Sequence, residues 1–183
     1  CSIDYWLYQV QPYKTIPKHT QTLCESKSPI KSLNNTIALV AEISNESDAL
    51  LIADFCQENQ IIMLTECHSK LFGYKGSQHL IDLSIDQILK SNIEVDTILY
   101  FGEKIISKKA IELIKKCKHK IHISDQQDAN DSSLAATLSL KATYESSLAY
   151  LKQCSFTYLA TWKDELNALF DHVNQILISK KEM

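Results

Sequence analysis

The sequence predicts an α/β fold in three layers, in which helices cover both faces of a doubly wound, mostly parallel sheet of five to six strands. Two observations carry this prediction. Residues 36–41 and 61–64 are continuous apolar runs, which are typical of strands covered on both faces, and a segment with helical periodicity separates them. The chain of 183 residues is also 45% hydrophobic, which suffices for one domain with a sizeable core.

The first strand–helix–strand unit is the clearest. Residues 36–41 form its first strand, and the polar stretch 44–48 supplies helix caps and first-turn acids. The unit closes with the strand at 61–64, and its crossover is expected to be right-handed. The helix between them has apolar residues at helical spacing, namely Ala49, Ile52, Ala53 and Cys56.

The later elements alternate in the same way, after a loop that contains Gly73 and Gly76. Because residues 136–140 alternate between apolar and polar, this strand is expected nearer an edge of the sheet. In chain order we expect a helix near 84–91, a strand at 96–101, a helix at 107–117, strands at 119–124 and 136–140, a short helix at 144–152, and a long amphipathic helix traced by apolar residues from Tyr158 to Leu177.

These elements divide the chain into three regions. Residues 1–35 are polar, with scattered aromatic residues and all three prolines, and predict an extended lead-in arm with a short helix near 20–27. Residues 36–153 form the α/β central domain, and residues 154–183 an amphipathic C-terminal linker helix. The two end segments either pack on neighbouring domains or cover the same sheet.

The composition argues against several function classes. A net charge of −3 gives no basic surface for nucleic acid. No apolar run reaches the roughly 18 residues that span a membrane, and no export signal is visible, so we expect a cytoplasmic protein without a membrane partner. The three glycines, Gly73, Gly76 and Gly102, cannot form a glycine-rich phosphate loop, and all 19 basic residues are lysine.

The cysteines and histidines do not predict a metal or nucleophilic site. The six cysteines show no C-x-x-C pair and are expected to be reduced and mostly buried. Cys117, His119 and His122 are close in sequence, but the two histidines should point to opposite faces of a strand. Cys67 and His68 are adjacent, and adjacent side chains seldom face one another. We therefore expect no metal ligands and no catalytic residue in this chain.

The candidate site lies where the strand at 96–101 leads into a helix. The strand reaches Gly102, a short loop follows, and Ser107 opens the helix, so that Lys108 and Lys109 fall in its first turn. A cation there is disfavoured by about 0.3–1 kcal/mol, which indicates an anion nearby. With free backbone N–H groups beside them, these three residues are predicted to bind an anionic small molecule. The alternative is two solvated surface lysines.

The same stretch resembles a known family. Asp96 to Gly102, running into Ile106-Ser107-Lys108-Lys109, is similar to the D-L-L-x-x-F-G-G-x-x-x-S-K-R segment in the central domain of 2-succinyl-5-enolpyruvyl-6-hydroxy-3-cyclohexene-1-carboxylate synthases. These are thiamine-diphosphate enzymes of menaquinone biosynthesis. The likeness covers most of residues 36–165. Supporting stretches are Leu64-Thr65-Glu66 with Ser69, Lys120 to Ser124, and Tyr158 to Lys163.

The resemblance implies a function for the whole enzyme rather than for this chain alone. The family decarboxylates 2-oxoglutarate and adds the product to isochorismate, and its basic pair, here Lys108 and Lys109, contacts the anionic substrate. Thiamine diphosphate and Mg²⁺ are held by flanking domains through a glutamate and a G-D-G…N segment, and no G-D-G occurs here. The chain would thus be a fragment of a transferase, with the flanking domains of the same polypeptide as partners in a homo-oligomer.

Two positions depart from the family pattern. Lys109 stands where arginine is usual, which removes bidentate geometry, and Glu103 replaces the second glycine. Two other functions therefore stay open. One is a non-catalytic α/β binding or assembly module, and the other is a small stand-alone ligand-binding or redox protein.

Overall fold

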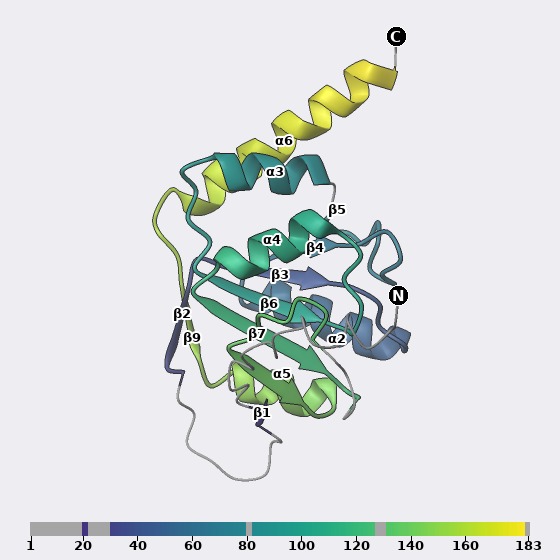
Figure 1. Cartoon of the computed structure of the whole chain (residues 1–183), viewed down its shortest axis with the longest axis vertical. Helices are drawn as coiled ribbons and strands as arrows, with labels where there is room; N and C mark the ends of the chain where they lie inside the picture. The colour runs from purple at the N-terminus through teal and green to yellow at the C-terminus, as the bar shows by residue number, and fades with distance from the viewer. Residues whose placement is uncertain (1–19, 22–29, 80–81, 127–130, 182–183) are drawn as a thin grey trace, which may run out of the picture.

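The structure is a computed structural model that describes residues 20–21, 30–79, 82–126 and 131–181. Its centre is one parallel sheet (Figure 1). The strands are β1 (Thr20–Gln21), β3 (Thr36–Val40), β4 (Ile62–Thr65), β5 (Ser77–His79), β6 (Thr97–Phe101), β7 (His119–Ser124) and β8 (Leu138–Lys141). Their order across the sheet is β1-β8-β7-β6-β3-β4-β5, and every neighbouring pair is parallel.

Helices cover both faces of this sheet, which confirms the predicted three-layer, doubly wound α/β fold (Figure 1). One face packs against α2 (Glu46–Glu58) and α5 (Tyr144–Leu151), and the other against α3 (Asp82–Lys90), α4 (Lys108–Lys116) and α6 (Trp162–Lys181). Successive side chains of β3 point to opposite faces of the sheet. Ala38 packs in the core beneath α2 and α5, and Ile37 packs in the core beneath α3, α4 and α6. Both are fully buried, as expected for a central strand.

The strand order places a change of direction beside β3. From β3 the chain moves outward through β4 to β5, then returns to form β6 on the opposite side of β3. In open α/β sheets, the loops at the carboxyl ends of two such strands separate and form the crevice where ligands bind. A ligand site is therefore expected at the carboxyl edge of the sheet, between the loops that follow β3 and β6.

The five strands expected from the sequence form the middle of the sheet. β5 adds a sixth strand and the two-residue β1 a seventh, beyond β8, which lies second from that edge. The prediction of a helix near 20–27 is wrong at Thr20 and Gln21, because these two residues form a strand that pairs with β8. The rest of that segment, and the aromatic residues of the predicted arm, lie outside the described residues.

A second, two-stranded sheet joins segments from the two ends of the fold. β2 (Ser32–Asn34), from the predicted arm, pairs in parallel with β9 (Ser155–Thr157), from the predicted linker. α6 then begins against the sheet and continues beyond it (Figure 1). Its residues Trp162, Leu166 and Phe170 are buried in the core that also contains α3 and α4. The first half of α6 thus covers the same sheet, and no helix among the described residues has the length and apolar character needed to cross a bilayer.

Candidate functional site

The carboxyl edge between β3 and β6 is held together by backbone contacts around Gly102. Its φ of +92° is a left-handed conformation, and a Cβ atom placed there would lie 2.3 Å from the carbonyl oxygen of Glu42, the second residue after β3. Its N–H donates to the carbonyl of Ile123 at 3.0 Å. Its own carbonyl lies 2.9 Å from Nε2 of the buried His122. Only glycine fits here, and it fixes the start of the loop that leads to α4.

The predicted helix start is confirmed. Ser107 is the N-cap of α4, and its Oγ accepts a hydrogen bond from the backbone N–H of Ala110 at 3.0 Å. α4 begins at Lys108, so that Lys108 and Lys109 lie in its first turn, after the carboxyl end of β6. A serine cap followed by apolar residues at helical spacing was therefore sufficient to locate this position.

Two backbone N–H groups directly before the first turn of α4 already have a partner within the chain, which the sequence did not predict. Glu66, which comes directly after β4 and is 3% exposed, accepts them through its carboxylate. Its Oε1 receives hydrogen bonds from the N–H groups of Ile106 and Ser107, both at 3.0 Å. A negative charge is favourable at a helix N-terminus, so the chain supplies its own anion there.

Two of the three predicted site residues also have partners within the chain. The hydroxyl of Ser107 donates to Oδ1 of Asp82, on α3, at 2.6 Å. Nζ of Lys109 lies 3.2 Å from Oδ1 of Asp86, also on α3, and 3.3 Å from Oε2 of Glu112, one turn further along α4. The hydrogen bond to Asp86 is the main cause of the raised pKa of Lys109. These contacts attach the start of α4 to α3.

Lys108 differs from its neighbour. Its side chain is exposed, and none of the ion pairs formed among the described residues involves it. Of the two lysines predicted to bind an anion, Lys108 is thus the one whose ammonium group faces solvent at this edge of the sheet.

A histidine links the two loops at the same edge. Nδ1 of His68 lies 3.4 Å from Oε2 of Glu66, and its Nε2 lies 3.2 Å from the backbone carbonyl of Lys104. The adjacent Cys67 is exposed and is not in a disulfide. The contact of His68 Nε2 thus joins the β4 loop to the β6 loop.

A small hollow of about 120 Å³ lies at the carboxyl ends of β3, β6 and β7. Three carboxylate residues line it, together with Ser44, Gln126 and the buried Tyr144; they are Glu42, Glu103 and Asp125. Burial is the main cause of the raised pKa of Tyr144, and the charges of Asp125 and Glu103 add to it. This lining is unfavourable for an anion, so an anionic ligand at this edge would be attracted to Lys108 and not to the hollow.

Cys117 and His122 pack and form hydrogen bonds within the fold. Burial raises the pKa of the Cys117 thiol to about 12, and its Sγ donates to the carbonyl of Leu113. The His122 ring stacks on Tyr100, with ring centroids 5.0 Å apart. Nowhere in the described residues do three side chains of the kinds that bind metals come together.

Comparison of the chain with models of protein families and with curated proteins finds no match to either.

The sequence signal that located the helix start was its capping pattern. The signal for Glu66 was weaker, because an acidic residue directly after a buried strand predicts a position at the carboxyl edge but not its partner. That partner, the N–H of Ile106, is 40 residues away along the chain.

Proposed function

We propose that the chain is the central, substrate-contacting and scaffolding domain of a thiamine-diphosphate-dependent synthase. The enzyme would decarboxylate 2-oxoglutarate and add the product to isochorismate in menaquinone biosynthesis, in the cytoplasm. The observation that carries the proposal is the placement of Ser107, Lys108 and Lys109. They follow a buried strand and Gly102, and they open α4 at the carboxyl edge of a doubly wound sheet, in the order and spacing of the family segment.

The two lysines have different roles in this proposal. Lys109, paired with Asp86 and Glu112, positions α4 against α3. Lys108 has an exposed ammonium group and contacts a carboxylate of the anionic substrate. Ser107 caps the helix and orients its first turn. Binding energy for the substrate thus comes from one cation on a rigid helix start.

The residues of this chain do not fit thiamine diphosphate by themselves. The carboxylate of Glu66 already accepts the N–H groups of Ile106 and Ser107 at the start of α4, and its negative charge would repel a diphosphate there. The hollow beside it is lined by Glu42, Glu103 and Asp125, which would repel a diphosphate. We therefore assign the cofactor and Mg²⁺ to flanking domains of the same polypeptide in a homo-oligomer, and expect the isolated chain to show no decarboxylation of 2-oxoglutarate.

The test uses the full-length protein that contains this domain, assayed with thiamine diphosphate, Mg²⁺ and both substrates. Lys108→Ala should weaken the productive use of an anionic substrate by about 1–3 kcal/mol, the range for a charge-assisted hydrogen bond left unmade. Removing a cation from a helix N-terminus should leave the thermal midpoint unchanged or raise it slightly, by the equivalent of about 0.3–1 kcal/mol.

The matched control is Lys115→Ala, since Lys115 is an exposed lysine in the last turn of the same helix. It should leave kcat/KM for both substrates unchanged. A lower thermal midpoint with unaltered kinetics in Lys108→Ala would exclude the role of Lys108. Absence of thiamine-diphosphate-dependent turnover in the unmodified full-length protein would overturn the proposal as a whole.

A second candidate function is a non-catalytic α/β binding or assembly module. The observation that favours it is the internal pairing at the start of α4, where Asp82, Asp86 and Glu66 satisfy groups that would otherwise bind a ligand. The parent reading frame separates the two candidates. Flanking segments with the cofactor-activating glutamate and a G-D-G…N motif are expected for the synthase, whereas a module would lack them.

A further inference from the structure

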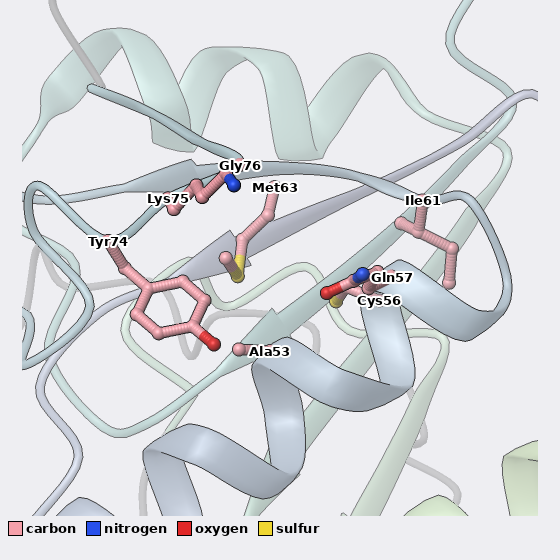
Figure 2. A pocket seen from close by; sticks show the side chains of 8 residues that line it. All are labelled: Ala53, Cys56, Gln57, Ile61, Met63, Tyr74, Lys75 and Gly76. Carbon is pink, nitrogen blue, oxygen red and sulfur yellow. The ribbon is translucent and has the colours of Figure 1, made fainter.

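We propose that a second hollow, on the opposite face of the sheet from α4, binds a small organic acid with an apolar body. It lies between α2, β4 and the turn that precedes β5, and its volume is about 500 Å³ (Figure 2). Pockets of about 300–1,000 Å³ are typical of small-molecule sites. Nothing in the proposed synthase role uses it, so this inference goes beyond that function.

The walls of the hollow are apolar and polarisable. Ala53 and Cys56 come from α2, Ile61 directly precedes β4, and Met63 lies in β4. In Figure 2 the sulfur atoms of Cys56 and Met63 both lie toward the hollow. Burial raises the pKa of the Cys56 thiol to about 12, so the thiol stays protonated and neutral at physiological pH. Such a surface suits a hydrocarbon chain or ring.

Three polar groups surround this apolar surface. Figure 2 shows the hydroxyl of Tyr74 directed toward Ala53, and the side-chain amide of Gln57 projecting from α2 on the opposite side. Neither side chain makes a hydrogen bond to any other described residue. Lys75 is exposed and follows the rim next to Gly76. The groups available to a ligand are thus two hydrogen-bond donors, the phenol and the amide, and one cation.

The charge of the lining decides the class of ligand. Among the eight residues that line the hollow, Lys75 carries a positive charge and none carries a carboxylate. An anionic group held by Lys75 would leave the rest of the molecule against Met63 and Ile61. A cationic ligand would find no carboxylate among these lining residues. The hollow at the carboxyl edge has the opposite character, because three carboxylates line it.

A pair of fluorescent dyes tests this inference on the isolated 183-residue chain. The anionic dye is 8-anilinonaphthalene-1-sulfonate, and the neutral dye is N-phenyl-1-naphthylamine, which has the same ring skeleton without the charge. Both should bind at one site with a fluorescence increase. Lys75→Glu should weaken binding of the anionic dye about tenfold, since it replaces attraction by repulsion, and should leave binding of the neutral dye unchanged.

Lys70→Glu is the matched control, because Lys70 is exposed in the same connecting segment but does not line the hollow. It should leave both dissociation constants unchanged. Ala53→Leu should weaken both dyes by filling the space. If that variant does not fold, Gln57→Trp at the exposed rim takes its place.

Decanoate should displace the anionic dye, and decanol should displace it much less. Equal dye binding by the unmodified chain, Lys75→Glu and the filling variant would overturn the proposal. Equal displacement by decanoate and decanol would overturn its anionic part. Neither outcome bears on catalysis by the full-length protein, so the two proposals fail independently.

Discussion

Glu66 connects a strand to a helix start 40 residues away, and its removal should be costly. In Glu66→Ala the N–H groups of Ile106 and Ser107 lose their shared acceptor, a carboxylate that is itself buried. We expect the free energy of unfolding in urea to fall by about 1.5–3 kcal/mol, the range for a hydrogen bond to a charged group. Glu58→Ala, which removes an exposed pair with Lys152, should cost less than about 1 kcal/mol. Equal losses in the two variants would contradict this role of Glu66.

Gly102 allows a second comparison between matched residues. Gly102→Ala would place a Cβ atom 2.3 Å from a backbone oxygen at a positive φ, whereas at Gly73 the φ is also positive but no atom lies within 4 Å. Both variants should lose about 1–2 kcal/mol from the left-handed backbone. Only Gly102→Ala should lose a further amount of about 1–3 kcal/mol from overpacking. Thermal unfolding of the two single variants measures the difference, and no difference would mean that the loop shifts freely.

Among the connections between strands, the one from β7 to β8 has no helix in its described part, residues 125–126 and 131–137. Asp131 organises it. Its carboxylate accepts hydrogen bonds from the N–H groups of Ser133, Ala135 and Ala136 at 2.8–2.9 Å, and from the hydroxyl of Ser133. Burial alone would raise the pKa of Asp131, but these hydrogen bonds outweigh it and hold the pKa below the usual 3.8. The loop thus depends on a charged carboxylate.

This dependence predicts a pH profile. Because the pKa of Asp131 is lower in the folded state than in the unfolded chain, its stabilisation is complete above pH 3.8 and is lost as the pH falls through the folded value. Asp131→Asn should be about 1.5–3 kcal/mol less stable than the unmodified chain at pH 7. That difference should shrink below pH 4 in urea titrations. The exposed Asp54→Asn is the control and should differ by less than about 0.5 kcal/mol at pH 7.

The sequence predicted those elements whose own residues determine them. Residues 36–40 and 97–101 are apolar runs long enough to indicate a strand without knowledge of its partners, and residues 119–124 alternate between polar and apolar side chains. By contrast, β5 and β9 are three-residue segments of mostly polar composition, Ser-Gln-His and Ser-Phe-Thr, and pairing with distant strands alone makes them strands. Periodicity carries no information about such pairing.

The same distinction applies to the candidate site. Ser107 and the start of α4 are local features, so the capping pattern located them. The partners come from other elements: Glu66 follows β4, whereas Asp82 and Asp86 lie on α3 and approach only because α3 packs against α4. For this reason the sequence correctly placed two lysines at the helix start but could not indicate which of them is already paired.

On the scale of the whole molecule, α6 consists of a buried half and an exposed half. Trp162, Leu166, Phe170 and Val173 are each at most 2% exposed, and Nε1 of Trp162 donates to the carbonyl of Glu94 at 2.7 Å. Further along the helix, Ile178 is 59% exposed. A chain that ends after residue 175 should therefore keep the cooperative thermal unfolding of the unmodified chain.

A chain that ends after residue 160 loses all four buried side chains of this helix, each costing on the order of 2–5 kcal/mol. It should unfold at a much lower temperature or without cooperativity. Trp162→Ala tests the same contact by a single substitution, with an expected loss of about 3–5 kcal/mol. A fold that survives truncation after residue 160 would show that α6 is a linker and not part of the domain.

The pairing of β2 with β9 sets the order in which this domain can be completed. The hydroxyl of Ser155 bonds the carbonyl of Lys31, 124 residues earlier in the chain. At synthesis rates of about 5–20 residues per second, β2 waits about 6–25 s before its partner exists. A contact that closes so long a loop gains little until the intervening sheet has formed, so the small sheet closes after the strands between β2 and β9 have paired. In a newly made chain, its closure therefore reports that the domain between its two strands is complete.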